Sequence, residues 1–84
     1  MKTLNYFTSP TCGPCKMFKP IVDTITSELG VPTNYIDIST SMELANKFDV
    51  KAVPTIMLMK DGQMYKRHTG IMNKDQFKNF INNG

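Results

Sequence analysis

Two cysteines, Cys12 and Cys15, stand at the junction between a strand-like run and a long helical pattern, and this junction limits what the chain can fold into. Residues 2–7, KTLNYF, are apolar and aromatic with a preference for β structure. From Cys12 to Leu29 the apolar residues recur at helical spacing, and Gly30 then stops the pattern. The sequence therefore predicts a β–α unit in which both cysteines lie where the strand gives way to the helix.

The residues after Gly30 predict a second strand and a short second helix. Residues 33–38, TNYIDI, have strand character. Thr40 and Glu43 have the spacing of a capping box, which predicts a short helix ending near Phe48. The crossover through the first helix joins the first two strands in parallel.

The last third of the chain predicts a hairpin and a closing helix. Residues 54–59, PTIMLM, form a continuous apolar run that is typical of a central strand buried on both faces. Asp61-Gly62 is a strong hairpin signal, so residues 63–68 return as an antiparallel strand. Asn73 and Gln76 form a second capping box. The helix that follows places Phe77, Phe80 and Ile81 on one face and ends at Asn82-Asn83-Gly84.

The predicted order of elements is βαβ-α-ββα, which indicates an α/β fold. It consists of a four-stranded mixed sheet flanked by helices on both faces. A chain of 84 residues is long enough for one small domain and not for two, so we expect a single domain over residues 1–84.

Charge and hydrophobic pattern exclude several classes of partner. The net charge is +3. The ten basic residues of the chain are scattered and form no basic run of the kind that indicates nucleic-acid binding. The longest apolar run, residues 56–59, is far too short to span a membrane. The first ten residues lack the apolar stretch of a signal peptide. We therefore expect a cytoplasmic protein that binds neither nucleic acid nor membrane.

Three uses of the cysteine pair compete. A zinc site needs about four ligands, and beyond the two cysteines the chain offers one histidine, His68, so carboxylates or a second chain would have to complete it; no metal site is predicted. A structural disulfide across two residues would constrain little, and such bonds are rare in a reducing compartment. The third use is redox chemistry, for which a C-x-x-C motif at the start of a helix in a βαβ unit is a strong signal.

The predicted position of Cys12 suits a nucleophilic thiol. Only the thiolate attacks a disulfide, and a free thiol has a pKa of about 8.5. Unpaired N–H groups and the dipole at a helix N-terminus favour a negative charge there, which raises the thiolate fraction of Cys12. Cys15 lies one turn further on and is expected to be more buried, so it would attack the mixed disulfide. Pro14 stiffens the first turn at no cost in hydrogen bonding.

The chain resembles the thioredoxin-like family over nearly all of its length. The resemblance lies in CGPCK (residues 12–16), in Pro20 inside the helix, in VPT (residues 53–55), and in KDG with the later Gly70. It implies a minimal thioredoxin fold, with Cys12 as attacking thiolate, Cys15 as resolving thiol and a cis peptide bond before Pro54. It also implies a flat docking patch for partner proteins, made of Gly13, Pro14, Val53, Pro54 and Gly70.

The chain also departs from that family. Thr8 and Thr11 stand where thioredoxins usually have tryptophans, and Tyr6 stands in place of their buried aspartate. The run FTSPTC, residues 7–12, resembles glutaredoxins and small redoxins instead. A hydrogen bond from Tyr6 to a cysteine sulfur is one hypothesis for its role; a packed strand aromatic is the other.

The resemblance implies a dithiol–disulfide oxidoreductase that mainly reduces protein disulfides through Cys12 and Cys15. No cofactor is expected beyond that redox-active pair. The expected partners are protein disulfide substrates and an NADPH-dependent thioredoxin reductase, and the chain is expected to be a monomer. The alternatives are a glutathione-coupled glutaredoxin, a dedicated electron donor to ribonucleotide reductase, and a non-catalytic binding module.

Overall fold

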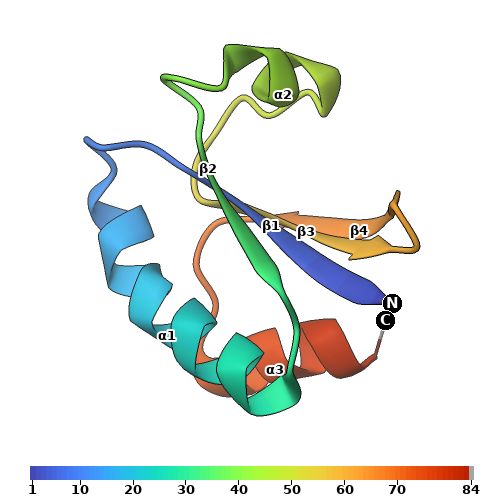
Figure 1. Ribbon diagram of the computed structural model, residues 1–84. Helices are drawn as coiled ribbons and strands as arrows, with labels where there is room; N and C mark the ends of the chain where they lie inside the picture. Colours follow the sequence, from blue (N-terminus) through green and yellow to red (C-terminus); the bar gives the residue numbers. More distant parts are fainter. Residues whose placement is uncertain (84) are drawn as a thin grey trace.

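The computed structural model describes residues 1–83 and confirms the expected order of elements (Figure 1). The elements are β1 (Lys2–Thr8), α1 (Gly13–Leu29), β2 (Thr33–Asp37), α2 (Met42–Lys47), β3 (Thr55–Lys60), β4 (Gln63–Thr69) and α3 (Lys74–Asn82). Most boundaries differ from the sequence-based ones by a residue or two. The proposed role of Gly84 in ending the last helix lies outside the described residues.

The strands form one mixed sheet in the order β2-β1-β3-β4. β1 pairs in parallel with β2, with Tyr6 opposite Tyr35, and antiparallel with β3, with Tyr6 opposite Ile56. β3 and β4 form the predicted hairpin, in which Asp61 and Gly62 both have positive φ, 53° and 84°. β3 is thus a central strand, and its first five residues are buried as the apolar run predicted.

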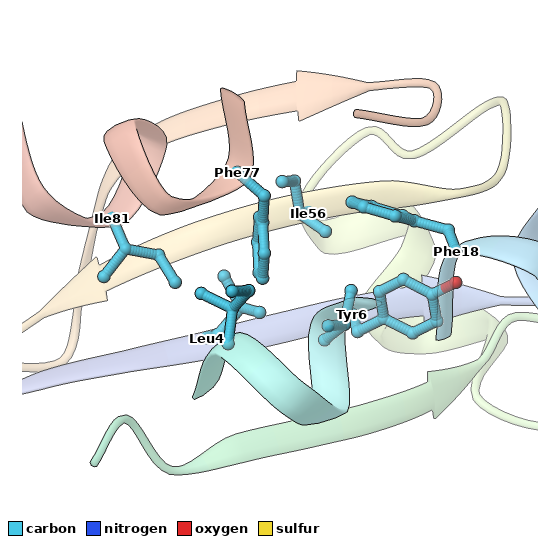
Figure 2. Close-up of a cluster of buried hydrophobic side chains, with 8 residues drawn as sticks. Leu4, Tyr6, Phe18, Ile56, Phe77 and Ile81 are labelled. Atoms are coloured by element: carbon cyan, nitrogen blue, oxygen red, sulfur yellow. The ribbon is translucent and has the colours of Figure 1, made fainter. Parts of the chain in front are cut away.

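Helices cover both faces of the sheet. α1 and α3 pack on one face, around a cluster drawn in Figure 2, in which Phe18 and Phe77 meet edge to face with ring centroids 5.5 Å apart. The members of this cluster are Leu4, Tyr6, Phe18, Val22, Ile25, Ile56, Phe77 and Ile81. The opposite face packs against α2 through a second cluster, made of Phe7, Ile36, Ala45, Val50, Met57 and Met59. Because β1 and β3 supply both clusters, the two central strands are buried on both sides.

Helix α1 has a defined beginning and end. Cys12 is its N-cap residue, with extended backbone angles, and Pro14 lies in the first turn where no partner for its missing N–H is needed. At the other end Gly30 adopts the left-handed conformation, with φ of 65°, and its N–H bonds the carbonyl of Ser27 at 3.4 Å. The predicted start and stop of this helix are confirmed.

The predicted capping box at Thr40 and Glu43 is wrong. The N-cap of α2 is Ser41, which makes no side-chain capping bond. Thr40 lies in a turn instead, because the Asp37 carbonyl accepts the backbone N–H groups of Thr40 at 3.2 Å and Ser41 at 2.8 Å. The second capping box is confirmed: Asn73 accepts the N–H of Gln76 at 2.8 Å, and the Gln76 side chain accepts the N–H of Asn73 at 3.1 Å.

No helix within residues 1–83 is both long enough and apolar enough to cross a membrane.

Candidate active site

The two cysteines are joined by a disulfide at the start of α1. Their Cα atoms are 5.2 Å apart, and the Sγ of Cys12 accepts the backbone N–H of Cys15 at 3.1 Å. Cys12 is half-buried, whereas Cys15 is only 1% exposed. The pair therefore consists of one partly exposed cysteine and one buried cysteine.

A tight turn presents Cys12 at the helix start. Its backbone N–H bonds the carbonyl of Ser9 at 3.1 Å, and its own carbonyl accepts the N–H of Lys16 at 3.3 Å. Gly13 and Pro14 follow in the first turn and are exposed. One N–H of the helix N-terminus, that of Cys15, donates to this sulfur, in line with the expected position of Cys12 at the helix start.

The register of the sheet brings the other predicted docking residues to the same end of the molecule. Phe7, at the end of β1 that leads to the cysteines, pairs with Thr55, which pairs in turn with Thr69. Pro54 and Gly70 directly adjoin these positions, and the N–H of Gly70 bonds the Pro54 carbonyl at 2.8 Å.

The bond between Val53 and Pro54 is cis, as the resemblance implied. Val53 is half-buried and Pro54 is buried, while Gly70 is half-buried with φ of 106°. This φ lies in the region that only glycine adopts readily, so the position requires glycine. Val53, Pro54 and Gly70 thus lie at the sheet end from which the cysteine turn departs.

Tyr6 links the sheet to the cysteine pair. Its hydroxyl donates a 2.6 Å hydrogen bond to the backbone carbonyl of Cys15, and the side chain is fully buried. Of the two hypotheses for Tyr6, the packed strand aromatic is confirmed by its contacts with Phe18 and Tyr35, and its hydroxyl bonds the backbone of Cys15 rather than a cysteine sulfur. Burial, with a smaller contribution from the negative charge of Asp23, raises the pKa of Tyr6 to about 12. Its phenol stays neutral and acts as a hydrogen-bond donor at ordinary pH.

A polar cluster that the sequence analysis missed lies beside Tyr6. The Tyr35 ring meets that of Tyr6 edge to face at 5.8 Å, and its hydroxyl donates to the Asp23 carboxylate. Lys19 pairs with the same carboxylate at 3.1 Å and lies 4.8 Å from the centre of the Tyr35 ring. The Tyr35 hydroxyl, and then Lys19, lower the pKa of Asp23. The four-residue spacing of Lys19 and Asp23 was a detectable signal, but their contact with strand β2 depends on the tertiary fold.

His68 lies on β4, two residues before Gly70. Its Nε2 is 4.0 Å from the position that a Cβ on Gly70 would occupy, and the side chain is half-buried. In the part of the chain that the structure describes, no three histidine, cysteine or acidic residues are grouped as metal ligands.

Comparison with known proteins adds two kinds of finding. Residues 1–83 match the family model described as thioredoxin. The chain is 32% identical to thioredoxin of Bacillus subtilis over 78 residues, which cover 90% of this chain and 75% of that protein. It is 35% identical to thioredoxin of Haemophilus influenzae over 78 residues, 90% of this chain and 73% of that protein.

Solved structures are also similar. A mutant thioredoxin from Halobacterium salinarum superposes with a TM-score of 0.93 at 30% identity, covering 98% of this chain and 73% of that one. The oxidized form of mitochondrial thioredoxin 3 from Saccharomyces cerevisiae gives 0.90 at 30% identity, covering 99% of this chain and 78% of that one.

Proposed function

Since the chain belongs to the thioredoxin family and is a dithiol–disulfide oxidoreductase, we propose that it works mainly as a protein disulfide reductase, with Cys12 attacking and Cys15 resolving. The observation that supports these roles is the unequal exposure of the two cysteines at one helix start. Cys12 is accessible and receives the N–H of Cys15, while Cys15 is buried behind it.

The reaction begins with the reduced pair. The Cys12 thiolate attacks one sulfur of a substrate disulfide; that S–S bond breaks, one substrate sulfur leaves as a thiolate, and a mixed disulfide forms. Cys15 then loses its proton and attacks the Cys12 sulfur. The mixed disulfide breaks, the second substrate thiolate leaves, and both substrate thiolates take up protons from water. Two electrons have passed to the substrate, and the Cys12–Cys15 disulfide remains.

Substrates dock on the patch made of Gly13, Pro14, Val53, Pro54 and Gly70. Its geometry supports this role, because the exposed cysteine turn and the cis-proline segment lie at one end of the sheet. The backbone of Val53 would pair with an extended substrate chain as a short added strand.

The proposed reductant is an NADPH-dependent thioredoxin reductase. In this proposal the chain works as a monomer in the cytoplasm, which is a reducing compartment. The thioredoxin relatives support this partner. The comparisons do not favour the glutathione-coupled, dedicated-donor and non-catalytic alternatives.

The deciding experiment is insulin-disulfide reduction with two electron sources in parallel. One reaction contains thioredoxin reductase and NADPH, and the other contains glutathione, glutathione reductase and NADPH. We expect sustained turnover in the first and little in the second. Efficient turnover only with glutathione would replace this proposal with the glutaredoxin alternative.

Cysteine variants test the two roles separately. Cys12→Ser should abolish reduction, because no accessible thiolate remains. Cys15→Ser should form mixed disulfides with insulin chains that persist and are visible by mass spectrometry. Full activity of Cys12→Ser would exclude the mechanism.

A further inference from the structure

A shallow apolar hollow lies beside the cysteine pair, outside the docking patch named above. It has a volume of about 90 Å³ and lies between α1 and the segment that joins β4 to α3. Figure 1 shows this orange segment running down toward α3 near α1. The lining residues are Met17, Phe18, Ile21, Ile71 and Met72.

The rim of this hollow is unusually exposed for such side chains. Met17 is 73% and Ile71 is 56% exposed, whereas the floor is formed by Phe18, which is 1% exposed. A buried aromatic floor with two exposed aliphatic walls leaves apolar surface in water. Contact with another apolar group would remove that surface from water, which is favourable.

Chain neighbours connect the hollow to the redox site. Met17 follows Cys15 by two residues and is exposed on α1, and Ile71 directly follows Gly70, whose N–H bonds the Pro54 carbonyl. The two rim side chains therefore directly adjoin the segments that carry the cysteines and the docking patch.

The size and polarity of the hollow indicate its occupant. Its volume is far below the roughly 300–1,000 Å³ of sites for drug-sized ligands and cofactors, and is of the order of one side chain. Its walls are methionine, isoleucine and phenylalanine, which offer no hydrogen bonds to a polar group. One aliphatic side chain of a docked polypeptide fits both observations.

We propose that this hollow, the Met17–Ile71 hollow, is a specificity subsite that receives a leucine-sized apolar side chain flanking the substrate disulfide. The inference rests on the proposed reductase function and names a preferred class of substrate. The enzyme selects polypeptide disulfides with an adjacent aliphatic residue over polar disulfides, because contact in the hollow adds binding that a polar neighbour lacks.

The test uses two disulfide-bonded peptides that differ only in having leucine or serine on both sides of the cysteine. The ratio of their kcat/KM values measures selectivity. We expect a preference of about tenfold for the leucine peptide, of the order that one apolar pocket provides. In the double variant Met17→Ala, Ile71→Ala the ratio should fall toward one, through a higher KM for the leucine peptide.

Met64→Ala is the matched control. Met64 is also an exposed methionine, 46% accessible, but it pairs with Met59 near the hairpin, at the opposite end of β4 from Gly70. This variant should keep the selectivity of the parent chain. Equal selectivity in the parent and the double variant would overturn the inference, and so would an equal loss in the Met64→Ala control.

A binding measurement separates the subsite from the chemistry. Leucine and serine peptides with their cysteines replaced by serine cannot react, so the methyl NMR signals of Met17 and Ile71 report docking alone. These signals should shift with the leucine peptide and not with the serine peptide. Shifts without any turnover would contradict the reductase proposal and support the subsite. Turnover without shifts would overturn the subsite and leave the reductase intact.

Discussion

At the scale of single residues, Tyr6 is the side chain that connects the fold to the chemistry. Its buried hydroxyl ties β1 to the carbonyl of Cys15 at 2.6 Å. The strand character of KTLNYF was enough to predict that Tyr6 lies on a strand. The acceptor of its hydroxyl could not be predicted, because it depends on how closely α1 approaches the sheet.

Replacing Tyr6 by phenylalanine should lower the free energy of unfolding by about 1 kcal/mol, the usual net contribution of one hydrogen bond. The ring keeps its packing against Phe18 and Tyr35, so little else changes. Urea denaturation of the reduced protein measures the difference. Tyr65→Phe is the control, since Tyr65 is 51% exposed, and should change stability by less than about 0.5 kcal/mol. Equal stability of both variants would mean that the Tyr6 bond adds nothing.

Tyr6 should also make stability depend on alkaline pH. The pKa of its phenol is about 12 in the folded chain, against an ordinary value of 10.0, because burial disfavours the phenolate. The unfolded chain therefore loses this proton first as the pH rises. The contribution of Tyr6 to stability is complete below pH 10 and declines between pH 10 and about 12. Thermal melts across that range should fall less steeply for Tyr6→Phe than for the parent chain; parallel curves would contradict this.

At the scale of elements, two similar sequence patterns had different outcomes. Asn73 with Gln76 and Thr40 with Glu43 have the same capping spacing, but only the first pair caps a helix. Asp37 explains the difference, because its carboxylate accepts both the backbone N–H and the hydroxyl of Ser39, at 2.8 and 2.6 Å. A turn therefore forms ahead of α2, and no local pattern reveals which of the competing bonds prevails.

This difference can be measured by two alanine variants. Asn73→Ala removes the bond to the N–H of Gln76 and should cost about 1 kcal/mol. Ser41→Ala occupies the corresponding N-cap of α2, where no side-chain bond exists, and should change stability by less than about 0.5 kcal/mol. Chemical denaturation of the pair is the measurement. A larger loss from Ser41→Ala than from Asn73→Ala would contradict the assignment of these caps.

At the scale of the whole molecule, the sequence predicted the element order, the central position of β3 and helices on both faces. Each rests on a strong local signal, such as the apolar run PTIMLM or the Asp61-Gly62 turn. Contacts between residues that are far apart in the sequence were harder to predict. The meeting of Asp23 with Tyr35 follows from the packing of α1 against the sheet, which no short pattern encodes.

The helices on the two faces of the sheet bury different numbers of residues, and this difference affects how readily each helix opens. Only Ala45 is buried within α2, whereas α1 buries five residues. Arg67 on β4 connects the end of α2 to the sheet. Its guanidinium donates to the carbonyl of Phe48 at 2.5 Å and to that of Asp49 at 3.4 Å. A segment that has few buried apolar contacts can open locally, without unfolding of the whole protein.

Hydrogen exchange should therefore separate α2 from the central strands. The amides of Ala45 and Phe48 should exchange with an opening free energy at least about 2 kcal/mol below that of Leu4 and Leu58. Arg67→Met should accelerate exchange in α2 about fivefold, the effect of one lost hydrogen bond, and leave the strands unchanged. Lys66→Met is the control, because Lys66 lies over Phe80 on the opposite face. If α2 and the central strands exchanged with one common free energy, the two layers would unfold together and Arg67 would have no separate segment to hold.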